Sequence, residues 1–141
     1  NNKLTRSIPS NLRWRNVTYF DLGSNQLTGT LPDDLGQTFS KLRHFFLDNN
    51  QFQGTLPESY LTVGNGRMEQ FAVNNNLLTG TVPSGHTQFN YLNLYRLDGN
   101  NFVSMSDTTC RLSVLVGGEN VEFRADCDIC ICRDDLFCRE C

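Results

Sequence analysis

The stretch Asn25–Pro32 reads NQLTGTLP, and closely similar stretches recur as NQFQGTLP from Asn50 and NLLTGTVP from Asn76. When these stretches are aligned, five asparagines form one column with spacings of 23, 25, 26 and 24 residues: Asn2, Asn25, Asn50, Asn76 and Asn100. A repeat of roughly 20 to 50 residues indicates a solenoid, because one unit cannot bury its own apolar residues, whereas stacked units form a continuous core.

Apolar residues occupy fixed positions around each asparagine. Positions −5 and −3 alternate as in a strand with one buried face, and with position −8 they comprise Val17, Phe20, Leu22, Leu42, Phe45, Leu47, Met68, Phe71, Val73, Leu92, Tyr95 and Leu97. A further apolar residue at +6 is followed by proline, so we expect an extended segment that leads into a turn. Glycine at +4 would permit a tight bend, and its replacement by Arg6 and Ser104 predicts looser geometry at the two ends.

This pattern resembles the leucine-rich repeat L-x-x-L-x-L-x-x-N-x-L, and LTGTLP is similar to the L-x-G-x-I-P signature of the plant-type class. The resemblance implies a right-handed leucine-rich repeat solenoid with a parallel β-sheet on the concave side and short 3₁₀ turns, rather than real helices, on the convex side. Each column asparagine would then exchange hydrogen bonds with the backbone of adjacent coils. We expect the repeats over residues 1–107, the first one partial, and a degenerate last repeat with a cysteine-rich C-terminal cap over 108–141.

Five of the six cysteines lie within the last 15 residues. Two pairs have the spacing of zinc ligands, but only seven residues separate the pairs, whereas zinc ribbons and fingers usually allow about 12 or more. An even number of cysteines beside repeats of receptor type favours three disulfides formed in an oxidising compartment, with zinc as the alternative. The predicted disulfide cysteines are Cys110, Cys127, Cys130, Cys132, Cys138 and Cys141, and we expect no metal and no cofactor.

Charge and hydropathy exclude several classes of partner. With 15 acidic and 12 basic side chains the net charge is −3, so the chain lacks the basic stripe that nucleic acid or an anionic membrane would require. No apolar run approaches the roughly 20 residues that cross a bilayer, so we expect no membrane insertion in this segment and leave an anchor outside it open. The chain opens inside the repeated phrase, which predicts that its true N-terminus lies upstream.

Asn16-Val17-Thr18 is a glycosylation sequon, so Asn16 is the predicted glycosylation site if the chain is secreted, with an unmodified turn before the strand as the alternative. The receptor-type repeat and the cysteines predict an extracellular or cell-surface location.

The exposed columns of the predicted strands are the candidate binding surface. Positions −6 and −4 point away from the core, and positions −2 and −1 are expected mostly to serve turns. Aromatic and apolar groups at −6 and −4 are surrounded by charged residues, which is typical of protein interfaces, and the family resemblance likewise implies ligand capture on this sheet. The predicted site for a protein, peptide or glycan comprises Tyr19, Asp21, His44, Phe46, Asp48, Gln70, Leu94, Arg96 and Asp98.

No nucleophile elbow, phosphate loop or spaced pair of carboxylates is present, so we expect no enzyme. The predicted role is a non-catalytic recognition module, as a receptor ectodomain, an adhesion protein or a secreted hydrolase inhibitor. An alternative role, ice binding or a structural part in a cell wall, would use a second narrow strand ladder with hydroxyls about 4.8 Å apart, since some plant relatives with this repeat are ice-binding. This ladder comprises Thr5, Ser7, Thr28, Thr30, Gln53, Thr55, Thr79 and Thr81.

Overall fold

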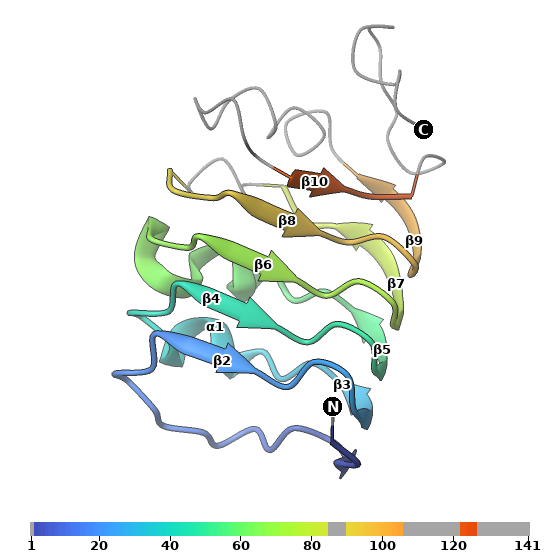
Figure 1. Ribbon diagram of the computed structural model, residues 1–141, viewed down its shortest axis with the longest axis horizontal. Coiled ribbons are helices and arrows are strands. Elements are labelled where there is room, and N and C mark those ends of the chain that lie inside the picture. The colour runs from blue at the N-terminus through green and yellow to red at the C-terminus, as the bar shows by residue number, and fades with distance from the viewer. Residues whose placement is uncertain (1, 85–89, 106–121, 127–141) are drawn as a thin grey trace, which may run out of the picture.

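The computed structural model describes residues 2–84, 90–105 and 122–126. Over these residues the chain winds into stacked coils, and each coil adds one strand to each of two parallel sheets (Figure 1). The concave sheet has the order β10-β8-β6-β4-β2 and consists of β2 (Tyr19–Asp21), β4 (His44–Phe46), β6 (Gln70–Ala72), β8 (Leu94–Arg96) and β10 (Glu122–Arg124). The flank sheet has the order β1-β3-β5-β7-β9 and consists of β1 (Thr5–Arg6), β3 (Gln26–Thr30), β5 (Gln51–Thr55), β7 (Leu77–Val82) and β9 (Asn101–Met105).

The two parallel sheets confirm the predicted solenoid and its second strand ladder. All six cysteines lie outside the described residues, so the disulfide-rich cap stays a prediction.

The convex side holds a short α-helix, α1 (Asp34–Thr38), and a 3₁₀ segment, η1 (Glu58–Gly66), which pack against each other. The 3₁₀ prediction is confirmed in η1, but α1 corrects the expectation that no α-helix would form. The helical turn suits this position because it buries Leu35 completely, and also Phe39, which directly follows the helix. Gly36 has no side chain, so its backbone can lie against Ser59. The Tyr60 hydroxyl ties η1 to the preceding coil by donating to the Pro32 carbonyl at 3.1 Å.

A stack of aromatic rings runs through the core directly behind the concave sheet. Successive ring centroids are 5.7, 5.4, 5.4 and 5.7 Å apart, with interplanar angles between 17° and 29°. The stack follows the −5 column because parallel strands in register place equivalent residues side by side. Its members are Phe20, Phe45, Phe71, Tyr95 and Phe123.

The column asparagines join consecutive coils, as predicted. Asn76 Nδ2 donates to the carbonyls of Val73 and Asn74 in its own coil, at 3.1 and 3.3 Å, and to that of Leu47 in the preceding coil at 3.0 Å. Its Oδ1 accepts the N–H of Phe52 in the preceding coil at 3.0 Å. The strand pairing leaves some backbone N–H and C=O groups of this turn without partners, and the asparagine side chain forms hydrogen bonds with them. Asn50 bonds in the same way. Asn100 donates to one carbonyl of its own coil, that of Leu97, and to one of the preceding coil, that of Val73, and it accepts the N–H of Leu78. Asn25 lacks the bond to a carbonyl of a preceding coil.

The glycines at +4 occupy left-handed backbone, with φ between 79° and 84° at Gly29, Gly54 and Gly80. Arg6 adopts the same conformation at φ 76°, so the backbone does not loosen there. At the other end the prediction is confirmed, because the pairing of β7 with β9 shifts between Gly80 and Thr81, opposite Ser104.

Candidate functional site

The register of the concave sheet confirms the two predicted columns. Position −6 aligns Tyr19, His44, Gln70 and Leu94, and position −4 aligns Asp21, Phe46, Ala72 and Arg96. β10 extends the two columns with Glu122 and Arg124. The repeat pattern did not predict these two positions, because the asparagine column ends at Asn100.

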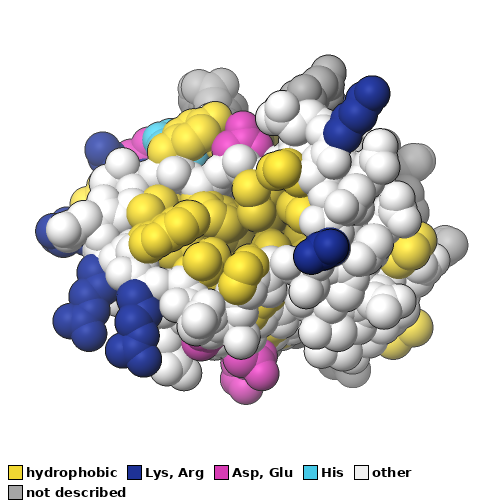
Figure 2. Space-filling view, turned by 90° about the horizontal axis from the view of Figure 1, so that it is seen from below, with side chains coloured by type: hydrophobic (Ala, Val, Ile, Leu, Met, Phe, Trp, Pro, Cys, Tyr) yellow, Lys and Arg dark blue, Asp and Glu magenta, His cyan; other side chains and the backbone are white. Residues whose placement is uncertain are grey.

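Three aromatic side chains on β2 and β4 form one cluster, the aromatic cluster of Tyr19, His44 and Phe46, in which Tyr19 is exposed and the other two are half-buried. The Tyr19 ring lies 5.4 Å from the His44 ring and 5.7 Å from the Phe46 ring, in tilted arrangements. The Tyr19 side chain is 58% exposed, so its contacts with the protein leave most of it open to solvent. Figure 2, seen from below, shows hydrophobic, histidine and acidic side chains adjoining at its upper edge, where the concave sheet lies.

Asp21 completes the cluster on its polar side. The Tyr19 hydroxyl donates to Asp21 Oδ2 at 3.4 Å, and the backbone N–H of Gly23 donates to Asp21 Oδ1 at 2.8 Å. Partial desolvation, with the charge and hydrogen bond of Asp21, raises the pKa of Tyr19. The phenol therefore stays neutral and able to donate at physiological pH.

A network of polar contacts holds His44 in place. Its Nδ1 lies 3.2 Å from Gln70 Oε1 and its Nε2 lies 3.5 Å from Glu69 Oε2, and Glu69 also pairs with Arg43. Glu69 could not be predicted from the repeat pattern, because it directly precedes β6 and belongs to none of the alternating columns. These contacts hold the ring of His44 beside that of Tyr19.

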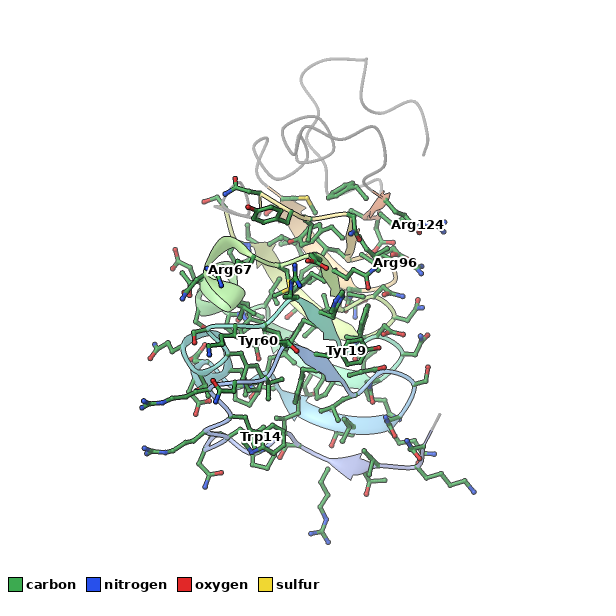
Figure 3. The ribbon with its side chains drawn as sticks, turned by 60° about the vertical axis from the view of Figure 1, so that its left-hand side comes forward. Trp14, Tyr19, Tyr60, Arg67, Arg96 and Arg124 are labelled. Atoms are coloured by element: carbon green, nitrogen blue, oxygen red, sulfur yellow. The ribbon has the colours of Figure 1, made fainter. Side chains whose placement is uncertain are left out.

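At the other end of the sheet the surface is charged. Arg96 binds the carboxylate of Asp98 with two guanidinium nitrogens, at 3.3 and 3.2 Å, and Arg124 pairs with Glu122 at 2.9 Å. The hydrogen bond with Asp98 raises the pKa of Arg96, and partial desolvation lowers it by less. The negative charges of Asp98, Glu122 and Asp48 raise the pKa further. Figure 3 shows Arg96 and Arg124 above Tyr19 along the sheet.

Between these two ends, two positions of the outer face are buried. Ala72 and Asn74 are each only 3% exposed, although their positions are on the outer face of the sheet. Ala72 has longer side chains on both of its register partners, Phe46 and Arg96, and these shield it. Ala72 therefore corrects the expectation that every residue of the −4 column is exposed.

The −2 column also lies on this surface. Backbone hydrogen bonds of 2.8 to 3.0 Å between neighbouring coils align its members, which are Gly23, Asp48, Asn74 and Asp98. The carboxylates of this column bond to nearby side chains: Asp48 Oδ2 accepts from Asn49 Nδ2 at 2.6 Å, and Asp98 accepts from Arg96. The Oδ1 atom of Asn74, by contrast, is buried and accepts no hydrogen bond within the part of the chain that the structure describes.

A hollow of about 560 Å³ lies away from this surface, between the first coil and α1. Its lining is mostly polar and holds no aromatic side chain: Ser10, Asn11, Leu12, Arg13, Arg15, Asp34, Gln37, Thr38 and Ser40. Small-molecule sites are mostly apolar cavities, whereas the aromatic cluster lies on an open sheet, which suits a larger ligand.

Other predicted features have definite places in the fold. Asn16 is exposed in a turn before β2, and its Oδ1 accepts from Lys41 Nζ at 3.0 Å. On the flank sheet, Thr79 Oγ1 donates to the Gly54 carbonyl at 3.3 Å, and Thr81 Oγ1 lies 2.8 Å from Ser104 Oγ. At these two positions the hydroxyl groups of the ladder therefore make contacts within the protein itself. The ice-binding role of the ladder stays a prediction.

No group of three His, Cys, Asp or Glu side chains that could hold a metal ion occurs among residues 2–84, 90–105 and 122–126. Over the same residues, none of the helices is long and apolar enough to cross a membrane.

Comparison with known proteins places these coils in a family. The family model described as Leucine Rich Repeat matches residues 16–38 and 41–61. The crystal structure of a TDR receptor has a TM-score of 0.71 and 31% sequence identity, over 80% of this chain and 19% of that chain. No protein of curated function matches the sequence.

Two receptor kinase ectodomains from Arabidopsis thaliana are also similar. The leucine-rich repeat ectodomain of GASSHO1/SCHENGEN3, in complex with CASPARIAN STRIP INTEGRITY FACTOR 2, has a TM-score of 0.73 and 26% identity, over 82% of this chain and 14% of that chain. The ectodomain of SOBIR1 has a TM-score of 0.65 and 27% identity, over 72% of this chain and 54% of that chain. The chain spans less than two thirds of each of these three structures.

The fold, the family match and these structures agree on one class. The chain has the leucine-rich repeat fold with the plant-type signature, in which the column asparagines and the L-x-G-x-I-P tail build two parallel strand ladders.

Proposed function

We propose that the protein is a non-catalytic recognition module that binds a protein or peptide ligand on its concave sheet, with the aromatic cluster as the main contact. The observation that carries this proposal is the exposure of Tyr19, 58%, while its ring contacts both His44 and Phe46. Rigid aromatic groups within a polar rim contribute most of the binding energy in many protein interfaces.

The polar rim is already ordered. Asp21, Gln70 and Glu69 hold the aromatic side chains through the contacts described above, so little side-chain entropy would be lost on binding. The similarity to ectodomains of receptor kinases, one of them in complex with CASPARIAN STRIP INTEGRITY FACTOR 2, supports a ligand-binding role and an extracellular or cell-surface location. An exposed sequon at Asn16 is compatible with that location.

The test uses a display library of random dodecapeptides, selected for binding to the parent protein, followed by titration calorimetry with the selected peptides. Tyr19→Ala and Phe46→Ala should each weaken binding by about 2 kcal/mol or more, which is roughly a 30-fold loss of affinity. The control is Tyr91→Ala, which removes a 65% exposed tyrosine outside the strands of the concave sheet. If the selected peptides bind the Tyr19 and Phe46 variants as tightly as the parent, the proposed site is wrong.

A further inference from the structure

Two carboxylates converge above Gly23, where the −2 column has no side chain. A Cβ atom placed on Gly23 would lie 2.7 Å from Asp48 Oδ1 and 3.2 Å from Asp21 Oδ1. A hydrogen-bond donor that approaches Gly23 from solvent therefore meets oxygens from two neighbouring coils. Both carboxylates are held in place, since Asp21 accepts the Gly23 N–H and Asp48 accepts the Asn49 side-chain amide.

The aromatic cluster borders the same place. Phe46 is the register partner of Asp21, and the Tyr19 hydroxyl donates to Asp21. Aromatic faces attract cations through their quadrupole, and they also pack against the alkyl stem of a long basic side chain. Two carboxylates beside two aromatic rings therefore form a surface complementary to a basic side chain. The negative net charge of the chain, −3, adds a long-range attraction in the same sense.

A guanidinium group suits two carboxylates on neighbouring coils better than an ammonium group does, because it presents five N–H donors in a planar fork and stacks on aromatic rings.

The protein's own Arg96 is the competing cation. Its guanidinium forms both of its hydrogen bonds with Asp98, and Asp48 is the smallest of the charges that raise its pKa. Asp48 Oδ1 has no hydrogen bond to Arg96 among the described contacts, so the oxygens above Gly23 stay open to a ligand.

We propose that the place above Gly23, between the carboxylates of Asp21 and Asp48, binds the guanidinium group of an arginine side chain in the peptide or protein ligand. This inference rests on the proposed function, because it names the chemistry of the ligand that the concave sheet binds. The stem of the arginine lies against Phe46 and Tyr19.

The experiment uses peptides selected from the dodecapeptide library on the parent protein. The selected pool should be enriched in arginine, and replacement of that arginine by citrulline, which keeps the shape and removes the charge, should weaken binding at least tenfold. Asp48→Asn should weaken binding of the arginine peptide by a similar factor, and the citrulline peptide should lose little further affinity on this variant, because both changes remove the same contact. Gly23→Ala should also block the site, since its Cβ would displace the Asp48 carboxylate.

The matched control is Asp33→Asn, which removes one negative charge from an exposed position on the convex side and should leave the affinity within twofold. Peptides that depend on Phe46 but bind equally well with citrulline would overturn this inference alone. Peptides that do not depend on Phe46 would overturn the proposed concave site and this inference with it. A pool enriched in lysine instead of arginine would overturn the choice of a guanidinium group.

Discussion

The methyl group of Thr30 lies over Gly54 of the next coil, so that a Cβ on Gly54 would approach Thr30 Cγ2 to 3.1 Å. The same relationship joins Thr55 to Gly80, at 2.9 Å. It exists because the flank sheet pairs with an offset: Thr30 is the register partner of Gln53, two positions earlier in its repeat. The glycine at +4 and the small hydroxyl residue at +5 are therefore one packing unit, which explains why they recur together in the sequence.

Gly54→Ala is expected to destabilise the protein. The left-handed backbone at φ 82° costs a residue with a Cβ about 1–2 kcal/mol, and the close approach of Thr30 adds to this cost. Urea unfolding followed by circular dichroism should show a lower midpoint.

A second substitution separates the two causes. Thr30→Ser removes only the methyl group, so the double variant Thr30→Ser/Gly54→Ala should recover the steric part of the loss and retain the backbone part. A Gly54→Ala protein with the midpoint of the parent would refute this account of the repeat.

The asparagine column should show a graded effect. Asn76 is 6% exposed, and its replacement by alanine leaves the Phe52 N–H and several carbonyls without their partner. Each buried group left unpaired costs about 1–3 kcal/mol, so Asn76→Ala is expected to lose about 3 kcal/mol or more. Asn25→Ala should lose less, because Asn25 is only half-buried and makes no bond to the carbonyl of a preceding coil. Equal losses at the two positions in equilibrium unfolding would contradict the prediction.

The sheets and their columns could be predicted because each repeat superposes the same position of every coil. Once five asparagines are aligned, the partner of Tyr19 must be His44, and the register of the concave sheet bears this out. The aromatic stack of the −5 column follows from the same alignment, except for Phe123, which lies in a strand where the repeat pattern is lost.

The depth of individual residues could not be predicted from alternation. Ala72 and Asn74 are buried by what stands on the adjacent coils, and the alternation within one strand holds no information about its neighbours. The contact of Glu69 with His44 depends in the same way on the path of the chain just before β6. To predict that Asp21 and Asp48 converge above Gly23, one would need to know the exact offset between two strands. The sequence did contain one signal, since Gly23 has no side chain in an otherwise polar column.

The cysteine prediction can be tested by redox state. If the six cysteines form three disulfides, titration of the denatured, unreduced protein should find almost no free thiols, and a reductant should lower the melting temperature. A chelator is the control, because it should leave the melting temperature unchanged when no structural zinc is bound. Stoichiometric zinc in the purified protein would overturn the prediction.

The buried tyrosines of the core should make the free energy of unfolding fall at alkaline pH. Burial raises the pKa of Tyr60 far above the ordinary value for tyrosine, and the charges of Asp33 and Asp34 add to the shift. Burial likewise raises the pKa of Tyr95. Above about pH 10 the unfolded chain loses these protons while the folded chain retains them, so the unfolded state binds fewer protons and the free energy of unfolding falls as pH rises.

The expected slope is about 1.4 kcal/mol per pH unit for each of the two tyrosines once the unfolded groups have ionised. Urea midpoints measured between about pH 9 and pH 11 should fall accordingly. Tyr60→Phe should lessen the slope by the share of one tyrosine, at the cost of the hydrogen bond to the Pro32 carbonyl. Should the slope stay the same in the Tyr60→Phe protein, Tyr60 would have to ionise in the folded chain, and its place in the core between α1 and η1 would be wrong.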